Sequence, residues 1–311
     1  MTDDPSAPRA IAVAIATRER PVGLSRLLHS LDQCELPRGI DVEVFVVDND
    51  PRGGARRIVD DLDISLPVHY LHEQRLGIPF ARNRALDETG SFDHIAFVDD
   101  DEVVEPGWFV ALHDTLVRYG ADAATGSVSY ELPHRTPEWV GRGGFYEPLS
   151  FDDGELRPWA ATNNVLVRRA ALAERELRFD ETHPLFGATD GWLFRDLTRR
   201  GGTIRWSQQA LVREFVPANR TTPWWLARRA FRGGISASLE QRRIRSLAGA
   251  IIVSLRAAGR RCRDAGRHLL DTRREGSASA VHALRSAAQA AGRVYGLFGL
   301  SFEEYRRVDD E

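Results

Sequence analysis

The sequence predicts an α/β protein with a Rossmann-like, doubly wound and mostly parallel sheet. Through about residue 120 of the 311, short apolar runs alternate with segments of helical periodicity, which is typical of a parallel sheet covered by helices. Polar or acidic residues directly follow three of these runs. Ligands of such sheets bind beyond the carboxyl ends of the strands, so the same pattern predicts where a site lies.

The first half of the chain predicts four strands and four helices in alternation. Leu24, Leu27, Leu28 and Leu31 recur at the spacing of one buried helical face. Pro79 fits a helix that begins just before it, because proline is tolerated in the first turn. The expected strands are residues 11–16, 42–47, 68–72 and 95–98, and the expected helices are residues 22–32, 55–62, 78–88 and 109–119.

The pattern becomes irregular after residue 121. Residues 133–159 are rich in glycine, proline and tryptophan and are expected to form an irregular, ligand-facing loop. Strands are expected at residues 125–131, 163–167, 204–206 and 210–212, and a helix at residues 190–200. We divide the chain into a disordered N-terminus (1–9), a domain at 10–235 with a nucleotide-binding half (10–120) and an acceptor half (121–235), and a helical extension at 236–311.

Composition excludes several classes of function. All 42 basic residues are arginines, whereas P-loop enzymes, protein kinases, pyridoxal-phosphate enzymes and Schiff-base aldolases need a lysine. A net charge of -3 argues against nucleic-acid binding. Cys34 and Cys262 offer no disulfide framework or cysteine zinc site. With no signal peptide and no spanning segment expected, a cytoplasmic enzyme fits.

Three consecutive aspartates, Asp99, Asp100 and Asp101, follow the strand expected at residues 95–98. At ~4 Å and an effective dielectric of ~20, two carboxylates repel by roughly 4 kcal/mol. Mg²⁺ or Mn²⁺ removes this cost, because such ions bind one or two carboxylates together with substrate phosphates. A solvated acidic loop is the alternative, but Thr17 and Asp48 end neighbouring strands and favour a site.

Five motifs, taken together and in order, resemble the family 2 glycosyltransferases, which have the GT-A fold. They are Ala-Thr-Arg at 16–18, Val-Val-Asp-Asn-Asp at 46–50, Gly-Ile-Pro-Phe-Ala-Arg-Asn-Arg at 77–84, Phe-Val-Asp-Asp-Asp-Glu at 97–102 and Gly-Ala-Thr-Asp-Gly-Trp-Leu-Phe-Arg at 187–195. The resemblance covers about residues 10–235. It implies transfer of a sugar, with inversion, from a nucleoside diphosphate sugar to a hydroxyl acceptor.

The resemblance also implies roles for the donor-side residues. Thr17 and Arg18 match the first nucleotide-contacting loop, Asp48 the acid that bonds the base, and Arg82 a contact near the phosphates. Alternatively, Asp48 is a turn-forming residue and Arg82 a surface arginine. Arg220, Arg228, Arg229 and Arg232 could neutralise the departing diphosphate.

The aspartate run is similar to the family's D-x-D motif. Asp101 would bind Mn²⁺ or Mg²⁺ directly, and Asp99 and Asp100 would hold the ribose or metal-bound water, with Asp99 a further candidate ligand. Many relatives have a metal-binding histidine further along, where this chain has Glu214; we expect Glu214 to replace it. Asn163 and Asn164 match a segment that faces the sugar, although either could be a turn residue.

Asp190 is the candidate general base. An attacking hydroxyl needs a proton acceptor, and a positioned carboxylate contributes roughly 10²- to 10⁴-fold. The alternative is a helix N-cap, a position that aspartate favours. Thr189 stands where the family usually has glutamate, which bears on acceptor contacts.

The C-terminal extension is helical and rich in arginine. Residues 241–274 contain ten arginines against Asp264 and Asp271, a formal charge of +8. One apolar stripe and one arginine stripe run along it, as Ile251, Leu255, Ala258, Cys262, Ala265 and Leu269, and as Arg256, Arg260, Arg263, Arg267 and Arg274. A second helix repeats the apolar pattern. We expect these helices to pack on themselves or a second subunit, or to dock peripherally on an anionic inner-membrane face.

Two other functions remain open at this point. A sugar-1-phosphate nucleotidyltransferase would share the sheet and acid pair, but needs a glycine-rich first loop and a lysine. A non-catalytic nucleotide-sugar-binding protein is disfavoured by the presence of Asp48, Asp101 and Asp190 together. UDP is the family's commonest donor nucleotide, and the acceptor can be a saccharide, a lipid-linked sugar or a small molecule.

Overall fold

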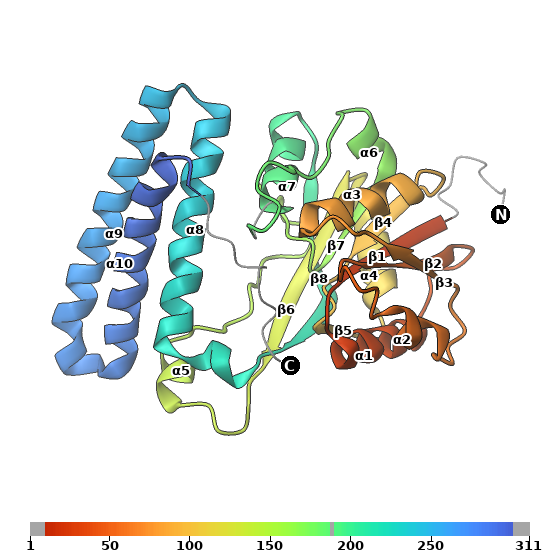
Figure 1. Cartoon of the computed structure of the whole chain (residues 1–311), viewed down its shortest axis with the longest axis horizontal. Coiled ribbons are helices and arrows are strands. Elements are labelled where there is room, and N and C mark those ends of the chain that lie inside the picture. Colours follow the sequence, from red (N-terminus) through yellow and green to blue (C-terminus); the bar gives the residue numbers. More distant parts are fainter. Residues whose placement is uncertain (1–9, 187–189, 301–311) are drawn as a thin grey trace.

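The computed structural model describes residues 10–186 and 190–300, with the backbone alone for residue 190 and residues 273–275. The expected disordered segment, residues 1–9, lies outside this part. An eight-stranded sheet runs through the described chain in the order β3-β2-β1-β4-β7-β6-β8-β5 (Figure 1). Its strands are β1 (Ala10–Thr17), β2 (Asp41–Asp48), β3 (Val68–His72), β4 (His94–Phe97), β5 (Glu102–Val104), β6 (Ala123–Glu131), β7 (Val165–Arg168) and β8 (Ile204–Phe215).

The predicted doubly wound, mostly parallel sheet is confirmed. β1 pairs in parallel with β2 on one side and with β4 on the other, so the strand order reverses direction at β1. β7 runs antiparallel to both of its neighbours, and β5 runs antiparallel to β8. The crevice beyond the carboxyl ends of β1 and β4 is therefore the topological switch point, where open α/β sheets bind ligands.

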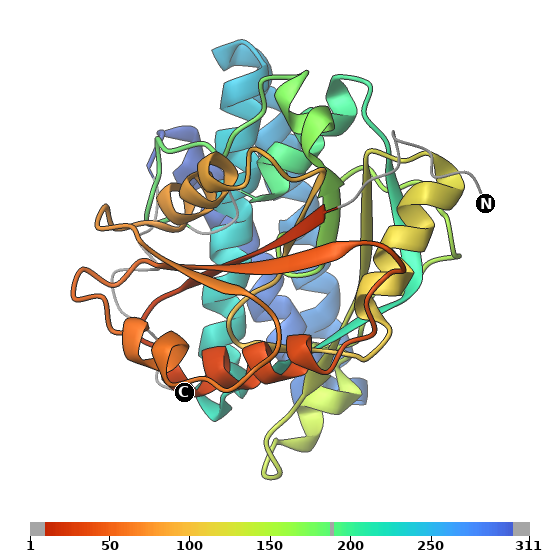
Figure 2. The same cartoon turned by 90° about the vertical axis from the view of Figure 1, so that its right-hand side faces the viewer.

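Helices cover both faces of the sheet and bury two apolar layers. The helices of the sheet domain are α1 (Pro21–Asp32), α2 (Arg56–Asp60), α3 (Ile78–Glu88), α4 (Trp108–Tyr119), α5 (Glu138–Arg142), α6 (Arg169–Ala173) and α7 (Asp190–Arg199). One layer packs α1 and α4 on the sheet, and the other packs α3 and α7 on the opposite face. Figure 2 shows α1 and α3 on opposite sides of β1 and β2.

Several elements differ from the predictions. The segments expected at 204–206 and 210–212 form the single strand β8. This strand pairs with β6 on both sides of a register shift, which lies between Gly126 and Ser127. A Cβ on Gly126 would lie 1.9 Å from the carbonyl oxygen of Ala210, so only glycine fits beside this bulge. β5, α5 and α6 were not predicted, because they are short elements of three to five residues. The loop expected at 133–159 therefore contains one helical turn.

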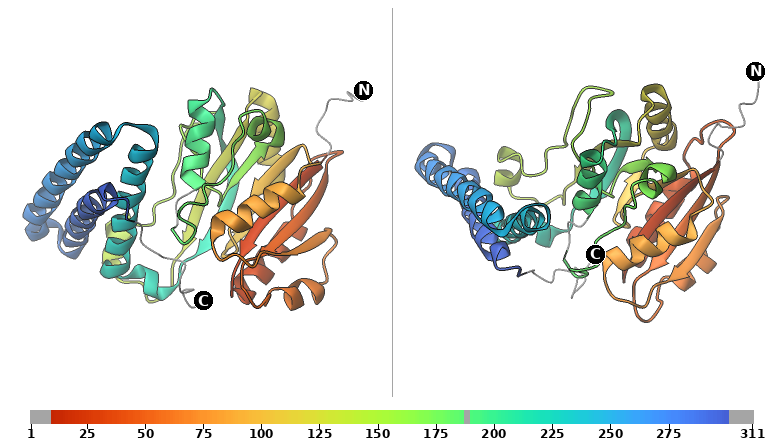
Figure 3. Two further views of the ribbon diagram at one scale, coloured as in Figure 1. Left: turned by 45° about the horizontal axis from the view of Figure 1, so that its top comes forward. Right: turned by 90° about the horizontal axis from the view of Figure 1, so that it is seen from above.

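The C-terminal extension is a bundle of α8 (Pro223–Ile244), α9 (Leu247–Glu275) and α10 (Ser277–Leu297), as Figures 1 and 3 show. The expected boundary at residues 235/236 falls within α8. Helices α8 and α10 touch closely, since a Cβ on Gly292 would lie 1.9 Å from the carbonyl oxygen of Phe231. The three helices pack on one another as expected, but Ile251, Leu255, Cys262 and Leu269 of the expected apolar stripe are exposed. None of the described helices combines the length and apolarity needed to cross a membrane.

Candidate active site

The carboxyl ends of β1 and β4 meet at the switch point of the sheet. Thr17 is the last residue of β1, and its buried Oγ1 donates a 2.8 Å hydrogen bond to Oδ2 of Asp100. Asp99, Asp100 and Asp101 follow β4 directly. The predicted convergence of these strand ends is therefore present.

Two arginines lie among the carboxylates of this site. Nη1 of Arg20, in the loop after β1, is 3.0 Å from Oδ1 of Asp100 and 2.7 Å from Oδ2 of Asp101. Nη1 of Arg220 is 3.3 Å from Oδ2 of Asp101 and 3.2 Å from Oε1 of Glu214. Arg220 thus joins β8 to the aspartate run, and Glu214 lies in the same cluster as Asp101.

Glu102 adds a further acid to the cluster. It is the direct register partner of Glu214 between β5 and β8, and it is 1% exposed. Like charges directly opposite on paired strands destabilise a sheet. Burial, and then the charges of Asp99 and Asp101, raise the pKa of Glu102 well above its usual value. This glutamate therefore favours the protonated form.

Two further carboxyl groups of the cluster, those of Asp100 and Glu214, also have raised pKa values. Burial raises the pKa of Asp100 to about 7, with Asp101 adding to the effect and Arg20 opposing it. Burial also raises the pKa of Glu214 to about 7, again with Asp101 adding and Arg229 and Arg220 opposing. The arginines oppose the effect of burial without cancelling it, so both carboxyl groups hold a proton more strongly than they would in water.

The donor atoms available here fit Mg²⁺ or Mn²⁺. They are all carboxylate oxygens, the ligand type these ions prefer. Within the described ranges, no three acidic, histidine or cysteine side chains converge as a ready-made metal site. An ion at this position would need phosphate and water oxygens to complete its shell, which is how Mg²⁺ commonly binds beside substrate phosphates.

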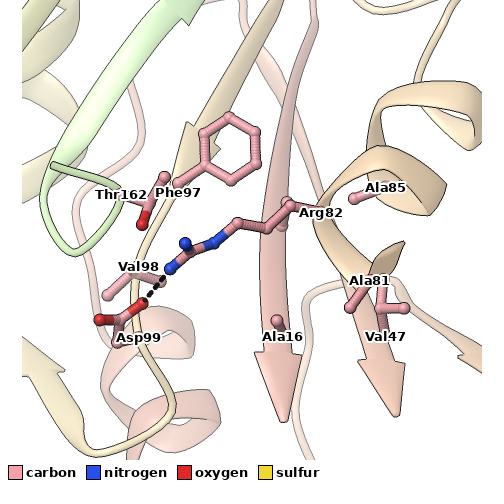
Figure 4. Close-up of a pocket in the computed structure, with 10 residues that line it drawn as sticks. Ala16, Val47, Ala81, Arg82, Ala85, Phe97, Val98, Asp99 and Thr162 are labelled. Atoms are coloured by element: carbon pink, nitrogen blue, oxygen red, sulfur yellow. Dashed lines mark hydrogen bonds and ion pairs between the residues drawn. The ribbon is translucent and has the colours of Figure 1, made fainter. Parts of the chain in front are cut away.

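A small cavity adjoins Asp99 beneath α3. It leaves about 10 Å³ for the centre of a water-sized sphere, close to the room that one water molecule needs, so it can house only part of a large ligand. Figure 4 shows Arg82 reaching from α3 across the end of β1 toward Asp99. Nη2 of Arg82 is 3.1 Å from Oδ1 of Asp99. Arg82 therefore lies in the site rather than on the outer surface.

Alanine side chains line much of this cavity and leave room in it. Ala16 of β1 and Ala81 and Ala85 of α3 line it, with Val47 at the end of β2 (Figure 4). Small side chains at these positions let Arg82 lie along the sheet. The Gly-Ile-Pro-Phe-Ala-Arg-Asn-Arg motif thus supplies both the arginine and the space it occupies.

Asp48 occupies the end of β2, next to Thr17 in register. The side chain is fully buried. Its Oδ1 accepts a bond from the backbone N–H of Asp50 (2.9 Å), and its Oδ2 accepts bonds from the N–H of Ala55 (2.8 Å) and from Tyr70 Oη (3.0 Å). These bonds give Asp48 a loop-bracing role, and its expected contact with a base stays a prediction.

Asn164 is likewise placed in the core instead of facing a sugar. It is 1% exposed, and its Oδ1 accepts a 2.8 Å bond from Trp108 Nε1. Its Nδ2 donates to the carbonyl oxygens of Ser127 (2.9 Å) and Ala210 (2.8 Å). This amide ties β6 to β8 at the bulge. Asn163, the residue before it, is half-buried and stays a candidate for ligand contact.

The structure does not test the roles predicted for Asp190 and Arg18. Helix α7 begins at Asp190, but its side chain, and residues 187–189 before it, lie outside the described residues. Arg18 is half-buried in the loop after β1. Their roles stay predictions.

Arg20 and Glu102 are two residues of the site to which the sequence motifs gave no role. Both belong to quoted or adjoining segments, since Arg20 lies two residues beyond the Ala-Thr-Arg motif and Glu102 ends the acidic run. The sequence could have indicated Arg20, because this arginine follows a strand that ends at the same sheet edge as the three aspartates. It gave no indication that Glu102 faces Glu214, because β5 was not predicted.

Comparison with known proteins agrees with this geometry. The family model described as "Glycosyltransferase like family 2" matches residues 8–236. The succinoglycan biosynthesis protein ExoM of Rhizobium meliloti (strain 1021) is 36% identical over 228 residues, which are 72% of this chain and 72% of that protein. The glucosyl-dolichyl phosphate glucuronosyltransferase of Haloferax volcanii is 31% identical over 96 residues, or 30% of this chain and 28% of that protein.

A solved structure has the same fold. The crystal structure of S. aureus TarS 1-349 superposes with a TM-score of 0.50 at 17% sequence identity, over 72% of this chain and 65% of that chain. This chain thus spans just under two thirds of the TarS fragment. At this identity the likeness concerns the fold.

Proposed function

The chain belongs to glycosyltransferase family 2 and has the GT-A fold, and from this premise we propose that it is an inverting enzyme with a nucleoside diphosphate sugar as donor. The sugar passes to an acceptor hydroxyl in a single displacement. No covalent sugar–enzyme intermediate forms, so one proton acceptor and one stabilised leaving group are sufficient.

The observation that carries this proposal is the meeting of Asp100 and Asp101 with Arg20 and Arg220 at the switch point. A departing nucleoside diphosphate gains negative charge as the glycosidic bond breaks. Arginine suits that charge, because its planar fork of donors matches phosphate oxygens. Preorganised positive groups at the point where charge develops lower the barrier to the reaction.

We propose Mn²⁺ or Mg²⁺ as the cofactor, held by Asp101 together with Asp99 or Glu214. The ion would supply Lewis-acid stabilisation of the leaving diphosphate. The high pKa values of Asp100 and Glu214, caused by burial first and by neighbouring carboxylates second, support a cation here. Arg82, bonded to Asp99, would orient the phosphate end of the donor.

The acceptor side of the mechanism rests on Asp190. As the base, it takes the hydroxyl proton while the acceptor oxygen bonds to the anomeric carbon. Its place as the first residue of α7, within the motif at 187–195, supports this role. Asn163 is the proposed contact with the sugar.

For the acceptor we propose a saccharide hydroxyl in polysaccharide assembly. Similarity over 72% of the chain to a protein named for succinoglycan biosynthesis supports this choice. A UDP-sugar is the first candidate donor. Lipid-linked saccharides and small natural products are the other acceptors to compare with a polysaccharide hydroxyl.

A transfer assay tests the proposal. The purified chain is incubated with UDP-, TDP- or GDP-sugars, with Mn²⁺, and with oligosaccharide, lipid-linked and small hydroxyl acceptors. We expect product from one donor class, with the anomeric configuration inverted in the product's NMR spectrum. Retention of configuration contradicts the single displacement, and release of a sugar 1-phosphate contradicts glycosyl transfer.

A further inference from the structure

Helix α9 turns its small side chains inward and its large apolar side chains outward. The residues it buries against the bundle include Ala250, Ser254, Ala257, Ala258 and Ala265. The large apolar residues that it exposes are Leu247 (58%), Ile251 (36%), Ile252 (50%), Leu255 (49%), Leu269 (63%) and Leu270 (78%). A helix that needed only its own bundle would have the opposite arrangement.

Four arginines lie beside this apolar row. Arg256, Arg260, Arg263 and Arg267 are all exposed, and at 100° per residue they form one stripe adjoining the exposed leucines and isoleucines. Within the described residues, no ion pair joins any of the four to an acidic side chain. Asp264, the nearest acid, pairs with Arg261 instead. We call the exposed apolar row and these four arginines the α9 outer face.

The position of the helix leaves this face open. Figures 1 and 3 show α9 at the edge of the molecule, with α8 between it and the sheet. The charge of the chain is polarised in the same way: residues 241–274 carry +8, while the whole chain carries -3. The rest of the molecule is therefore net negative and the bundle edge is net positive.

We propose that the α9 outer face docks on a bilayer that contains anionic lipid. Such a surface satisfies both halves of the face at once, because hydrocarbon accepts the leucines and isoleucines while headgroup phosphates accept the arginines. A second copy paired through α9 would bury the apolar row but would bring no acidic row to the arginines. The helix lies in the interface, since none of the described helices can span a membrane.

Vesicle flotation tests the proposal on the full chain. Phosphatidylcholine vesicles with and without phosphatidylglycerol are compared at low and high salt. We expect binding to the anionic vesicles that weakens as salt rises, and little binding to the neutral ones. Equal binding to both kinds of vesicle, or to neither, overturns the proposal. Binding needs neither donor nor acceptor, so the result is independent of the proposed function.

A charge-matched pair of variants assigns the binding to α9. In one, Arg256, Arg260, Arg263 and Arg267 are changed to Gln; in the other, the exposed Arg38, Arg57, Arg118 and Arg135, all outside the bundle, are changed to Gln. Each arginine near an anionic surface contributes roughly five-fold in affinity, so we expect the first variant to lose several hundred-fold. The second should retain most of the binding. Equal loss in both contradicts a specific face.

The apolar row has its own variant. Leu269→Ser with Leu270→Ser changes two strongly exposed residues, and the fold should be unaffected in its thermal melt. We expect vesicle binding to fall roughly ten-fold or more. Sedimentation of the unmodified chain tests whether a second copy of the chain, and not a membrane, covers the α9 outer face. A concentration-dependent dimer that this variant abolishes would assign the face to a second copy and overturn the membrane proposal.

Discussion

Arg20 bonds to the carboxylate of Asp101 with 2.7 Å between Nη1 and Oδ2. The same nitrogen is 3.0 Å from Asp100, so one guanidinium spans both acids that follow β4. Positive charge is already present where the donor diphosphate is expected. The arginine at this point takes the place that a lysine often fills in phosphate sites, in a chain that contains no lysine.

Arg20→Gln should destabilise the fold and weaken UDP binding. Its side chain is 17% exposed and that of Asp100 is 8% exposed, so its removal leaves a buried carboxylate without its charge partner. We expect a loss of about 2 kcal/mol in the free energy of unfolding, measured by urea denaturation at pH 7. Arg52→Gln is the control, because Arg52 is 76% exposed and its loss should leave the free energy of unfolding almost unchanged. Equal effects would deny Arg20 this role.

Asn164→Ala and Asn163→Ala separate a core amide from a candidate ligand contact. The first removes the bonds that Asn164 makes to Trp108 Nε1 and to two carbonyl oxygens. We expect it to cost about 3 kcal/mol in the free energy of unfolding. Asn163→Ala should cost under about 1 kcal/mol and instead raise the KM for the donor. If the stability losses are alike, the structural assignment of Asn164 is wrong.

His94 predicts a pH dependence of stability. It is 1% exposed, neither ring nitrogen has a hydrogen-bond partner among the described residues, and it lies edge-on to His113 with centroids 6.0 Å apart. Burial first, and then His113, lower the pKa of His94 from 6.5 to about 4. Below pH 6.5 the unfolded state binds a proton that the folded state does not. Stability is thus lost as pH falls from about 6.5 to 4.

The His94→Leu variant isolates this contribution. Asp100 and Glu214 have pKa values raised to about 7 by burial and act with the opposite sign, since their stabilisation is lost as pH rises toward 7. The difference between His94→Leu and the unmodified chain cancels those groups. We expect the variant to gain about 3 kcal/mol relative to the unmodified chain between pH 6.5 and 4. A difference that does not vary with pH would show that His94 protonates in the folded state.

Local signals in the sequence predicted much of the fold. Helix α3 and strand β3 have the predicted bounds, because glycine and proline mark the start of α3 in the sequence. Gly77 has φ 143°, and a Cβ there would lie 2.6 Å from Pro184. Only glycine therefore fits at this position without strain. Strand β5 gave no such signal. Its three residues are a strand only through pairing with β8, which is distant in sequence.

Periodicity and residue type did not predict the partners of every side chain in the site, or which face of α9 packs inward. Strand ends predicted that Thr17, Asp100 and Asp101 converge. They could not show that Asp48 and Asn164 would be enclosed, since an aspartate and an asparagine in loops look the same whether their partners are ligand or protein. In α9, the spacing showed which residues share a stripe, but the identity of the inward stripe depends on how closely α8 and α10 pack.

Asp101→Ala should abolish the effect of Mn²⁺ on UDP binding. Titration calorimetry of the unmodified chain should show donor-nucleotide affinity falling ten-fold or more when EDTA replaces Mn²⁺. The variant should bind UDP weakly and equally in both conditions. Asp60→Ala, which changes an exposed acid of α2, should respond to EDTA as the unmodified chain does. A full response to EDTA in Asp101→Ala would exclude Asp101 as a ligand.

Asp190→Asn should keep donor binding and lose transfer. The amide cannot accept the hydroxyl proton, so we expect kcat to fall roughly 10²- to 10⁴-fold while the Kd for UDP changes little. Asp196→Asn is the matched control, because Asp196 lies on the same helix and bonds Arg199 and Arg243; it should affect stability more than kcat. A loss of UDP affinity parallel to the loss of kcat would instead make Asp190 a residue that supports the donor site. Unchanged turnover would move the base elsewhere.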